Sequence, residues 1–288
     1  MRKIPHSLTL LALPFWLLSL SSMAAAQCSF RTLNIPGEGS SAIGINDQGA
    51  IVGAFLDSTT GQNHGYLVFK GKFTRFSFPG SLSTEALGIN SHGVIVGDYL
   101  KASRQHGFMV LNGSFHSIDA PGATSTRALG INKFGSIVGE RSSAAGVDGF
   151  VRRGTKFTTI HVPSSARTSA SGINDHGVIV GSFALPNGPN QGFILSTTGK
   201  FRTIDFPGAD NTTLTTIDNA GEVLGNYTMH GDTHGFSFAN GKFTTIDEPN
   251  AGVATIIFGV NNFDQIVGSF VGVPATNKSF TASCSRVF

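Results

Sequence analysis

The chain has 288 residues, with 20 basic and 17 acidic side chains, 37 glycines and two cysteines. Its length suits one sizeable domain. No Lys/Arg-rich run is present, which argues against nucleic acid as a partner.

The first 26 residues have the parts of a secretory signal peptide. Arg2 and Lys3 precede an apolar stretch, Leu8–Leu20, and small residues lead to Gln27. A retained membrane anchor is the alternative, although the stretch is shorter than the roughly 20 residues that a span needs. Cleavage after Ala26 leaves 18 basic and 17 acidic residues and no further candidate span, so we expect a secreted protein, extracellular or periplasmic.

A ten-residue phrase, Gly-Ile-Asn-x-x-Gly-x-Ile-Val-Gly, recurs along the chain in four close and two looser copies. The copies begin at Gly44, Gly88, Gly130, Gly172, Thr216 and Gly259. Successive starts are 44, 42, 42, 44 and 43 residues apart. A period in this range indicates a repeat architecture, in which one unit cannot bury its apolar face alone.

Each repeat unit divides into four short β-like runs. In the first unit these cover residues 42–46, 50–55, 64–69 and 72–78, separated by glycine-containing turns or polar loops. Four strands in about 42 residues match one propeller blade. A β-trefoil needs three units, and a parallel β-helix has shorter coils. Residues 27–288 are therefore predicted to form a single all-β domain, a six-bladed β-propeller with four antiparallel strands per blade.

The sixth unit lacks its fourth strand, because the chain ends soon after the third-strand run at 277–283. Residues 30–37 have the missing pattern, so we expect the N-terminal strand to complete the last blade and remove two open sheet edges. Cys28 and Cys284 fall where the connecting turn would be, which predicts a disulfide in an exported chain. In the loop-entropy model this bridge contributes at most about 4–5 kcal/mol. Two unrelated free thiols are the alternative.

The phrase and a downstream His-Gly-aromatic triplet together resemble the HAF family of bacterial extracellular repeats. The triplets are His64-Gly65-Tyr66, His106-Gly107-Phe108 and His234-Gly235-Phe236. The resemblance covers residues 30–283, but two units have Asp148 or Gln191 in place of His. It implies an exported repeat protein and supplies no catalytic residues.

Residues that recur in every unit are interpreted as structural. The recurring histidines lie too far apart around a ring to share a metal, so each is expected to bond backbone within its own blade. The third position of the phrase is an asparagine or aspartate in every unit: Asn46, Asn90, Asn132, Asn174, Asp218 and Asn261. The turns around it have too few carboxylates for calcium loops, so each of these side chains is expected to cap its own turn. We therefore predict no metal and no cofactor.

Candidate ligand-binding residues are those that break the repeat at one mouth of the central channel. They flank the inner strands of the second and third units and are Glu85, Asp98, Tyr99, Arg127, Glu140 and Arg141. Mixed charge at a rigid concave mouth is typical of a ligand site. A solvated salt-bridge cluster is the alternative interpretation.

The leading hypothesis is a monomeric, non-enzymatic exported protein that acts as a binding module or scaffold through this loop face. Its ligand would be a glycan, a peptide or an envelope protein. The alternative is a secreted hydrolase or lyase that uses the channel-mouth charges, with Asp98 and Glu140 as an acid/base pair. A purely structural surface protein is the third possibility. No Gly-x-Ser-x-Gly, phosphate loop or His-Glu-x-x-His motif occurs.

Overall fold

The computed structural model describes residues 28–36, 38–273 and 276–284, and within these ranges the chain forms 24 β-strands and no helix. The all-β class is therefore confirmed. The described residues include no helix with the length and apolar character that a membrane span requires. The predicted signal peptide lies outside the described residues and stays a prediction.

The strands follow the repeat units in chain order. The first unit contains β2 (Glu38–Ile45), β3 (Ile51–Asp57), β4 (Gln62–Phe69) and β5 (Lys72–Phe76). The second contains β6 (Ser83–Ile89), β7 (Ile95–Lys101), β8 (Arg104–Leu111) and β9 (Ser114–Ile118). The third contains β10 (Ser125–Ile131), β11 (Ile137–Ser143), β12 (Gly146–Arg153) and β13 (Lys156–Ile160).

The remaining strands belong to the last three units and to the N-terminal segment. The fourth unit contains β14 (Arg167–Ile173), β15 (Ile179–Ala184), β16 (Asn190–Leu195) and β17 (Phe201–Ile204). The fifth contains β18 (Asn211–Ile217), β19 (Val223–Met229), β20 (Asp232–Ala239) and β21 (Lys242–Ile246). The sixth contains β22 (Ala251–Val260), β23 (Gln265–Gly272) and β24 (Asn277–Cys284), and β1 (Cys28–Leu33) precedes the first unit.

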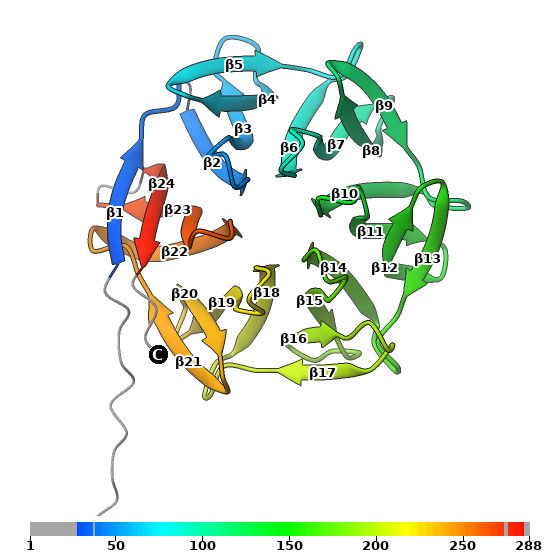
Figure 1. The fold of residues 1–288 in the computed structure, drawn as a ribbon, viewed down its shortest axis with the longest axis vertical. Helices are drawn as coiled ribbons and strands as arrows, with labels where there is room; N and C mark the ends of the chain where they lie inside the picture. The colour runs from blue at the N-terminus through cyan, green and yellow to red at the C-terminus, as the bar shows by residue number, and fades with distance from the viewer. Residues whose placement is uncertain (1–27, 37, 274–275, 285–288) are drawn as a thin grey trace, which may run out of the picture.

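The units stand around a central axis, and the first strand of each lies closest to it (Figure 1). Successive strands within a unit pair antiparallel, whereas single parallel bridges join the third unit to the fourth and the fifth to the sixth. The innermost strands are β2, β6, β10, β14, β18 and β22. Side chains on these strands therefore determine what lines the centre of the molecule.

Each innermost strand carries a β-bulge opposite the Ile-Val-Gly run. In β10 the register shifts between Ala128 and Gly130, so one additional residue enters the strand. The bulge brings the carbonyl oxygen of Arg127 against the backbone of Gly139, where an added Cβ would lie only 1.9 Å from that oxygen. The last glycine of the phrase is thus required by a close backbone contact.

Every unit buries one large aromatic side chain at the same position of its third strand, two residues after the position that His64, His106 and His234 occupy in three of the units. These side chains are Tyr66, Phe108, Phe150, Phe193, Phe236 and Phe280, and each is at most 1% exposed. Burial of one such side chain contributes about 2–3 kcal/mol. The preceding glycine leaves room for the adjacent strands, since an added Cβ at Gly107 would lie 2.8 Å from the Ile118 oxygen.

The asparagine of the phrase has two roles. In the first unit Asn46 Oδ1 accepts hydrogen bonds from the backbone N–H of Gln48 at 3.1 Å and of Ala50 at 2.9 Å, which confirms the predicted turn cap. Its Nδ2 also donates to the carbonyl oxygen of Asn90 in the next unit at 3.0 Å. The same inter-unit bond recurs from Asn90, Asn132, Asn174 and Asn261. These amides therefore link neighbouring units, a role that the sequence analysis missed.

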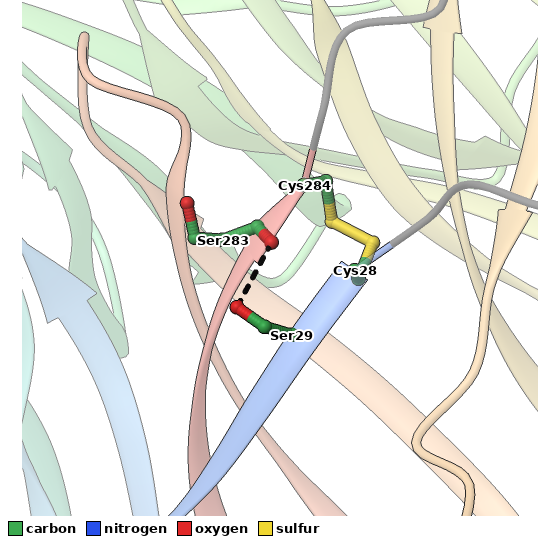
Figure 2. The surroundings of a disulfide bond; sticks show 4 residues. All are labelled: Cys28, Ser29, Ser283 and Cys284. Atoms are coloured by element: carbon green, nitrogen blue, oxygen red, sulfur yellow. Dashed lines mark hydrogen bonds between the residues drawn. A yellow bond between two sulfur atoms is a disulfide. The ribbon is translucent and has the colours of Figure 1, made fainter.

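The two ends of the described chain pair with each other. Strand β1 runs antiparallel to β24, with Cys28 opposite Cys284, and the two cysteines form a disulfide (Figure 2). The hydroxyl of Ser29 donates to the Ser283 carbonyl oxygen at 3.5 Å beside the bridge. The predicted Cys28–Cys284 disulfide is confirmed.

Candidate functional site

A cavity of about 450 Å³ lies at the centre of the ring and is lined by residues of the innermost strands. We call it the channel. Its volume lies within the range of small-molecule sites. Glu85 and Arg127 line one end, and Asp47, Lys133 and Asp175 line the other, where the turns of the repeated phrase lie. We call these ends the charged mouth and the turn mouth.

At the charged mouth a single arginine contacts three carboxylates. Arg127 donates from Nε to Asp98 Oδ1 at 3.0 Å and from Nη1 to Glu140 Oε1 at 3.4 Å. Its Nη2 lies 4.0 Å from Glu85 Oε2. The structure therefore brings together four of the six predicted site residues, which come from strands β6, β7, β10 and β11.

The strand register explains why this cluster forms. Glu85 pairs directly with Asp98 across β6 and β7, and like charges in that arrangement repel each other. Arg127, which pairs with Glu140 across β10 and β11, reaches from the next unit to offset the repulsion. Arg167 of the fourth unit also bonds Glu140, at 2.8 Å. The cluster thus links three consecutive units.

Burial separates the four groups into two that face the channel and two that support them. The side chains of Glu85 and Arg127 are 29% and 31% exposed, whereas those of Asp98 and Glu140 are 4% and 11% exposed. Asp98 also accepts a hydrogen bond from Gln105. A ligand in the channel would therefore contact Glu85 and Arg127 first.

The carboxyl pKa values diverge within the cluster. Burial, reinforced by the charge of Asp98, raises the pKa of Glu85. Burial also raises the pKa of Asp98, with Arg127 and Gln105 acting in opposition. At Glu140 burial acts in the same direction, but Arg167 and Arg127 outweigh it and lower the pKa. Glu85 and Glu140 therefore differ in proton affinity within one cluster.

The structure places the other two predicted site residues elsewhere. Tyr99 is 5% exposed, stacks on Phe78 with ring centroids 3.7 Å apart, and pairs its hydroxyl with Ser117. Its ring therefore belongs to the core and is not among the residues that line the channel. Arg141 donates to the Pro121 carbonyl oxygen at 3.1 Å and contacts Asp148 at 3.7 Å. It lies outside the group around Arg127.

The recurring histidines bond side chains, and the expectation of backbone partners is wrong. His106 Nδ1 lies 2.8 Å from Asp119, and His234 Nδ1 lies 2.8 Å from Asp247, each within one unit. In the third unit the two partners exchange places, with Asp148 on the third strand and His161 after the fourth, 2.9 Å apart. The pair is retained when its members are swapped, which assigns these histidines to the scaffold.

Sequence reasoning missed the residues that the bulges direct into the channel. They are Ile43, Leu87, Leu129, Ser171, Thr215 and Phe258, one from each unit, and we call them the bulge residues. Four are apolar and two carry hydroxyls. Their variation was visible in the sequence, but their direction depends on a register shift that the sequence alone does not reveal.

Further carboxylates lie near the turn mouth. Oxygen atoms of Asp218, Glu222 and Asp264 lie within 4.8 Å of one another, and Asp218 also lines the channel. Asp175 accepts hydrogen bonds from the Lys133 backbone and from Asn219 Nδ2, at 2.9 and 2.7 Å. Burial would raise the pKa of Asp175, but these bonds and Lys133 lower it. The turn mouth is thus a second acidic end of the cavity.

Comparisons with solved structures show the fold. A virginiamycin B lyase from Staphylococcus aureus aligns at 12% identity, with a TM-score of 0.53, over 89% of this chain and 99% of its own. A gluconolactonase from Xanthomonas campestris aligns at 11% identity, with a TM-score of 0.59, over 92% and 93%. The Aleuria aurantia lectin aligns at 10% identity, with a TM-score of 0.55, over 89% and 97%.

At these identities the similarities establish a β-propeller-like fold and nothing about activity. No protein-family model and no curated protein matches the chain. The resemblance to the HAF repeats therefore stays a prediction. The function has to be argued from the channel itself.

Replacement of Arg127 tests the electrostatics of the charged mouth. We expect Arg127→Met to lower the free energy of unfolding by about 3 kcal/mol near neutral pH, because it leaves nearby carboxylates uncompensated. Raised pKa values at Glu85 and Asp98 mean that these groups take up protons first as the pH falls. The loss should therefore shrink at acidic pH and grow as the pH rises through those pKa values.

Urea denaturation at acidic and slightly alkaline pH measures this effect. Arg75→Met is a matched control, because Arg75 is 56% exposed and pairs only at the surface with Asp57. It should cost less than about 1 kcal/mol. If both variants lost the same free energy of unfolding at every pH, the electrostatic interpretation would be contradicted.

Proposed function

We propose that this protein is an exported binding module, a six-bladed propeller closed by β1, that takes its ligand at the charged mouth of the channel. The carrying observation is the convergence of Glu85, Asp98, Arg127 and Glu140 at the opening of a 450 Å³ cavity. Asp98 and Glu140 hold Arg127 in position, while Glu85 and Arg127 offer acceptors and donors to a ligand.

Two further observations support export and binding. The Cys28–Cys284 disulfide fits an oxidising compartment, outside the cell or in the periplasm. The lectin with a similar fold is described in complex with a fucosylated sugar, which supports ligand binding as a role for this architecture. Glycans and peptides are both ligand classes with the hydrogen-bonding groups that Glu85 and Arg127 require.

Secreted hydrolase or lyase activity is the second candidate. The opposite pKa directions of Glu85 and Glu140 favour it, because groups with divergent pKa values serve as acid and base in many enzymes. Asp98 is a poor acid/base group, since its side chain is 4% exposed and is engaged by Arg127 and Gln105. Glu85 would replace it in such a reaction.

A panel of defined glycans and peptides, measured with the purified mature protein, tests the proposal. We expect at least one to bind, and Glu85→Gln to weaken that binding about tenfold or more. Asp205→Asn is the matched control, because Asp205 accepts from Gln191 at an exposed site away from the channel. If Glu85→Gln bound the ligand as tightly as the unsubstituted protein, the ligand site would have to lie elsewhere. Turnover abolished by Glu140→Gln would favour the enzyme instead.

A further inference from the structure

The channel lining is acidic in a chain of positive net charge. Among the described residues, four acidic side chains line it, Asp47, Glu85, Asp175 and Asp218, against the two bases Arg127 and Lys133. The whole chain, by contrast, carries a formal net charge of +3. A recess lined by one excess sign, with apolar walls, concentrates counter-ions of the opposite sign. The excess of acidic over basic side chains favours cations over anions in this cavity.

The acidic groups occupy the two ends of the channel and leave its middle apolar. Glu85 lies at the charged mouth, and Asp47 lies at the turn mouth, where it accepts hydrogen bonds from the backbone and side chain of Asn262 at 2.9–3.1 Å. Arg127 and Lys133, six positions apart on and just after β10, line opposite ends of the cavity. The ends are thus separated by about 15–20 Å of extended chain.

Aliphatic side chains line the middle of the channel. They form a ring with one member from each unit: Ile45, Ile89, Ile131, Ile173, Ile217 and Val260. The four apolar bulge residues extend this surface. A hydroxyl-rich chain passing this zone could replace few of its hydrogen bonds to water, through bulge residues such as Ser171 and Thr215, whereas methylene groups would gain by burial.

We propose that the channel binds a linear aliphatic diammonium ligand, with one ammonium group at each mouth and the methylene chain against the aliphatic ring. This inference rests on the proposed function, because it names the ligand class for the same cavity. Glu85 receives one ammonium group and Asp47 the other. Arg127 donates its hydrogen bonds to Asp98 and Glu140 and lies 4.0 Å from Glu85 Oε2. Glu85 Oε1 accepts from Asn63 at 3.0 Å, so the carboxylate keeps further acceptor positions for a cation.

Calorimetric titration of the mature, oxidised protein with diaminodecane is the central experiment. We expect this diamine to bind at least about tenfold more tightly than decylamine, which has one ammonium group, and than diaminobutane, which is too short. Decanedioate, with the same chain and the opposite charge, should not bind. Equal binding of decylamine, or tighter binding of decanedioate, would overturn the proposal.

Variants at the two mouths locate the ligand. Glu85→Gln and Asp47→Asn should each weaken diaminodecane binding about tenfold. Decylamine has one ammonium group and can occupy one mouth, so only one of the two variants should change its affinity. Asp205→Asn should change neither affinity. Because the two variants lie at opposite ends, one remains informative if the other folds poorly. Full affinity in both would exclude the spanning pose.

The outcome separates this inference from the proposed function. If diaminodecane fails to bind but a panel glycan or peptide binds and depends on Glu85, the binding module stands and the diammonium ligand is wrong. If neither diaminodecane nor any glycan or peptide of the panel binds, both the proposed function and the diammonium ligand are contradicted. If diaminodecane binds and each of the two mouth variants loses that binding, the proposed function and the diammonium ligand are both supported.

Discussion

Gly139→Ala should be among the most damaging single substitutions in this protein. The added methyl carbon would lie 1.9 Å from the Arg127 carbonyl oxygen, and that oxygen is held by the β-bulge of β10. Neither backbone segment can move without breaking the β10–β11 pairing. We expect the free energy of unfolding to fall by at least about 3 kcal/mol, measured by urea denaturation, or the variant to accumulate as insoluble protein.

Gly135→Asn is the matched control for this substitution. Gly135 has a φ of +75°, but no atom lies within 4 Å of an added Cβ. Asparagine tolerates this conformation, and Asp264 occupies the corresponding position of the sixth unit with a φ of 60°. The control should cost less than about 1 kcal/mol. Similar losses in both variants would show that backbone conformation, and not the carbonyl contact, is decisive.

Removal of the disulfide should produce the second large effect. Cys28 and Cys284 are 256 residues apart, so their bridge restricts the unfolded chain over nearly its whole described length. The double variant Cys28→Ser, Cys284→Ser should lose up to about 5 kcal/mol, the loop-entropy limit. Denaturant titration with and without a thiol reductant measures the loss.

Reductant supplies the control within the same experiment. It should shift the denaturation midpoint of the native protein toward that of the double variant and leave the double variant unchanged. A native protein whose midpoint does not move on verified reduction of the bridge would show that the β1–β24 pairing holds without covalent help.

The strands and the disulfide could be predicted because each depends on local pattern and spacing. Alternating residues and glycine turns marked the strands of the first unit within a few positions of their observed ends. The group around Arg127 could be proposed because the repeat fixes which positions are equivalent, so departures from it stand out. Whether these residues bind a ligand stays a prediction.

What could not be predicted depends on register and on contacts between units. Tyr99 follows Asp98 directly, and strand alternation places neighbouring side chains on opposite faces, so only one of the two could face the mouth. The bulge residues point inward because of a register shift that has no sequence marker of its own. The His–Asp pairs did leave a signal, since Asp148 and His161 exchange the usual places.

The pairing of β1 with β24 also makes the order of the units along the chain largely arbitrary. The Cα atoms of Cys28 and Cys284 are 4.0 Å apart, a gap that a short peptide linker can cross. Joining them and opening the chain at an exposed turn in another unit would give a circular permutant with the same strand pairings. In such a permutant we expect the peptide linker to hold β1 against β24 in place of the disulfide, so that this pairing no longer depends on an oxidising environment.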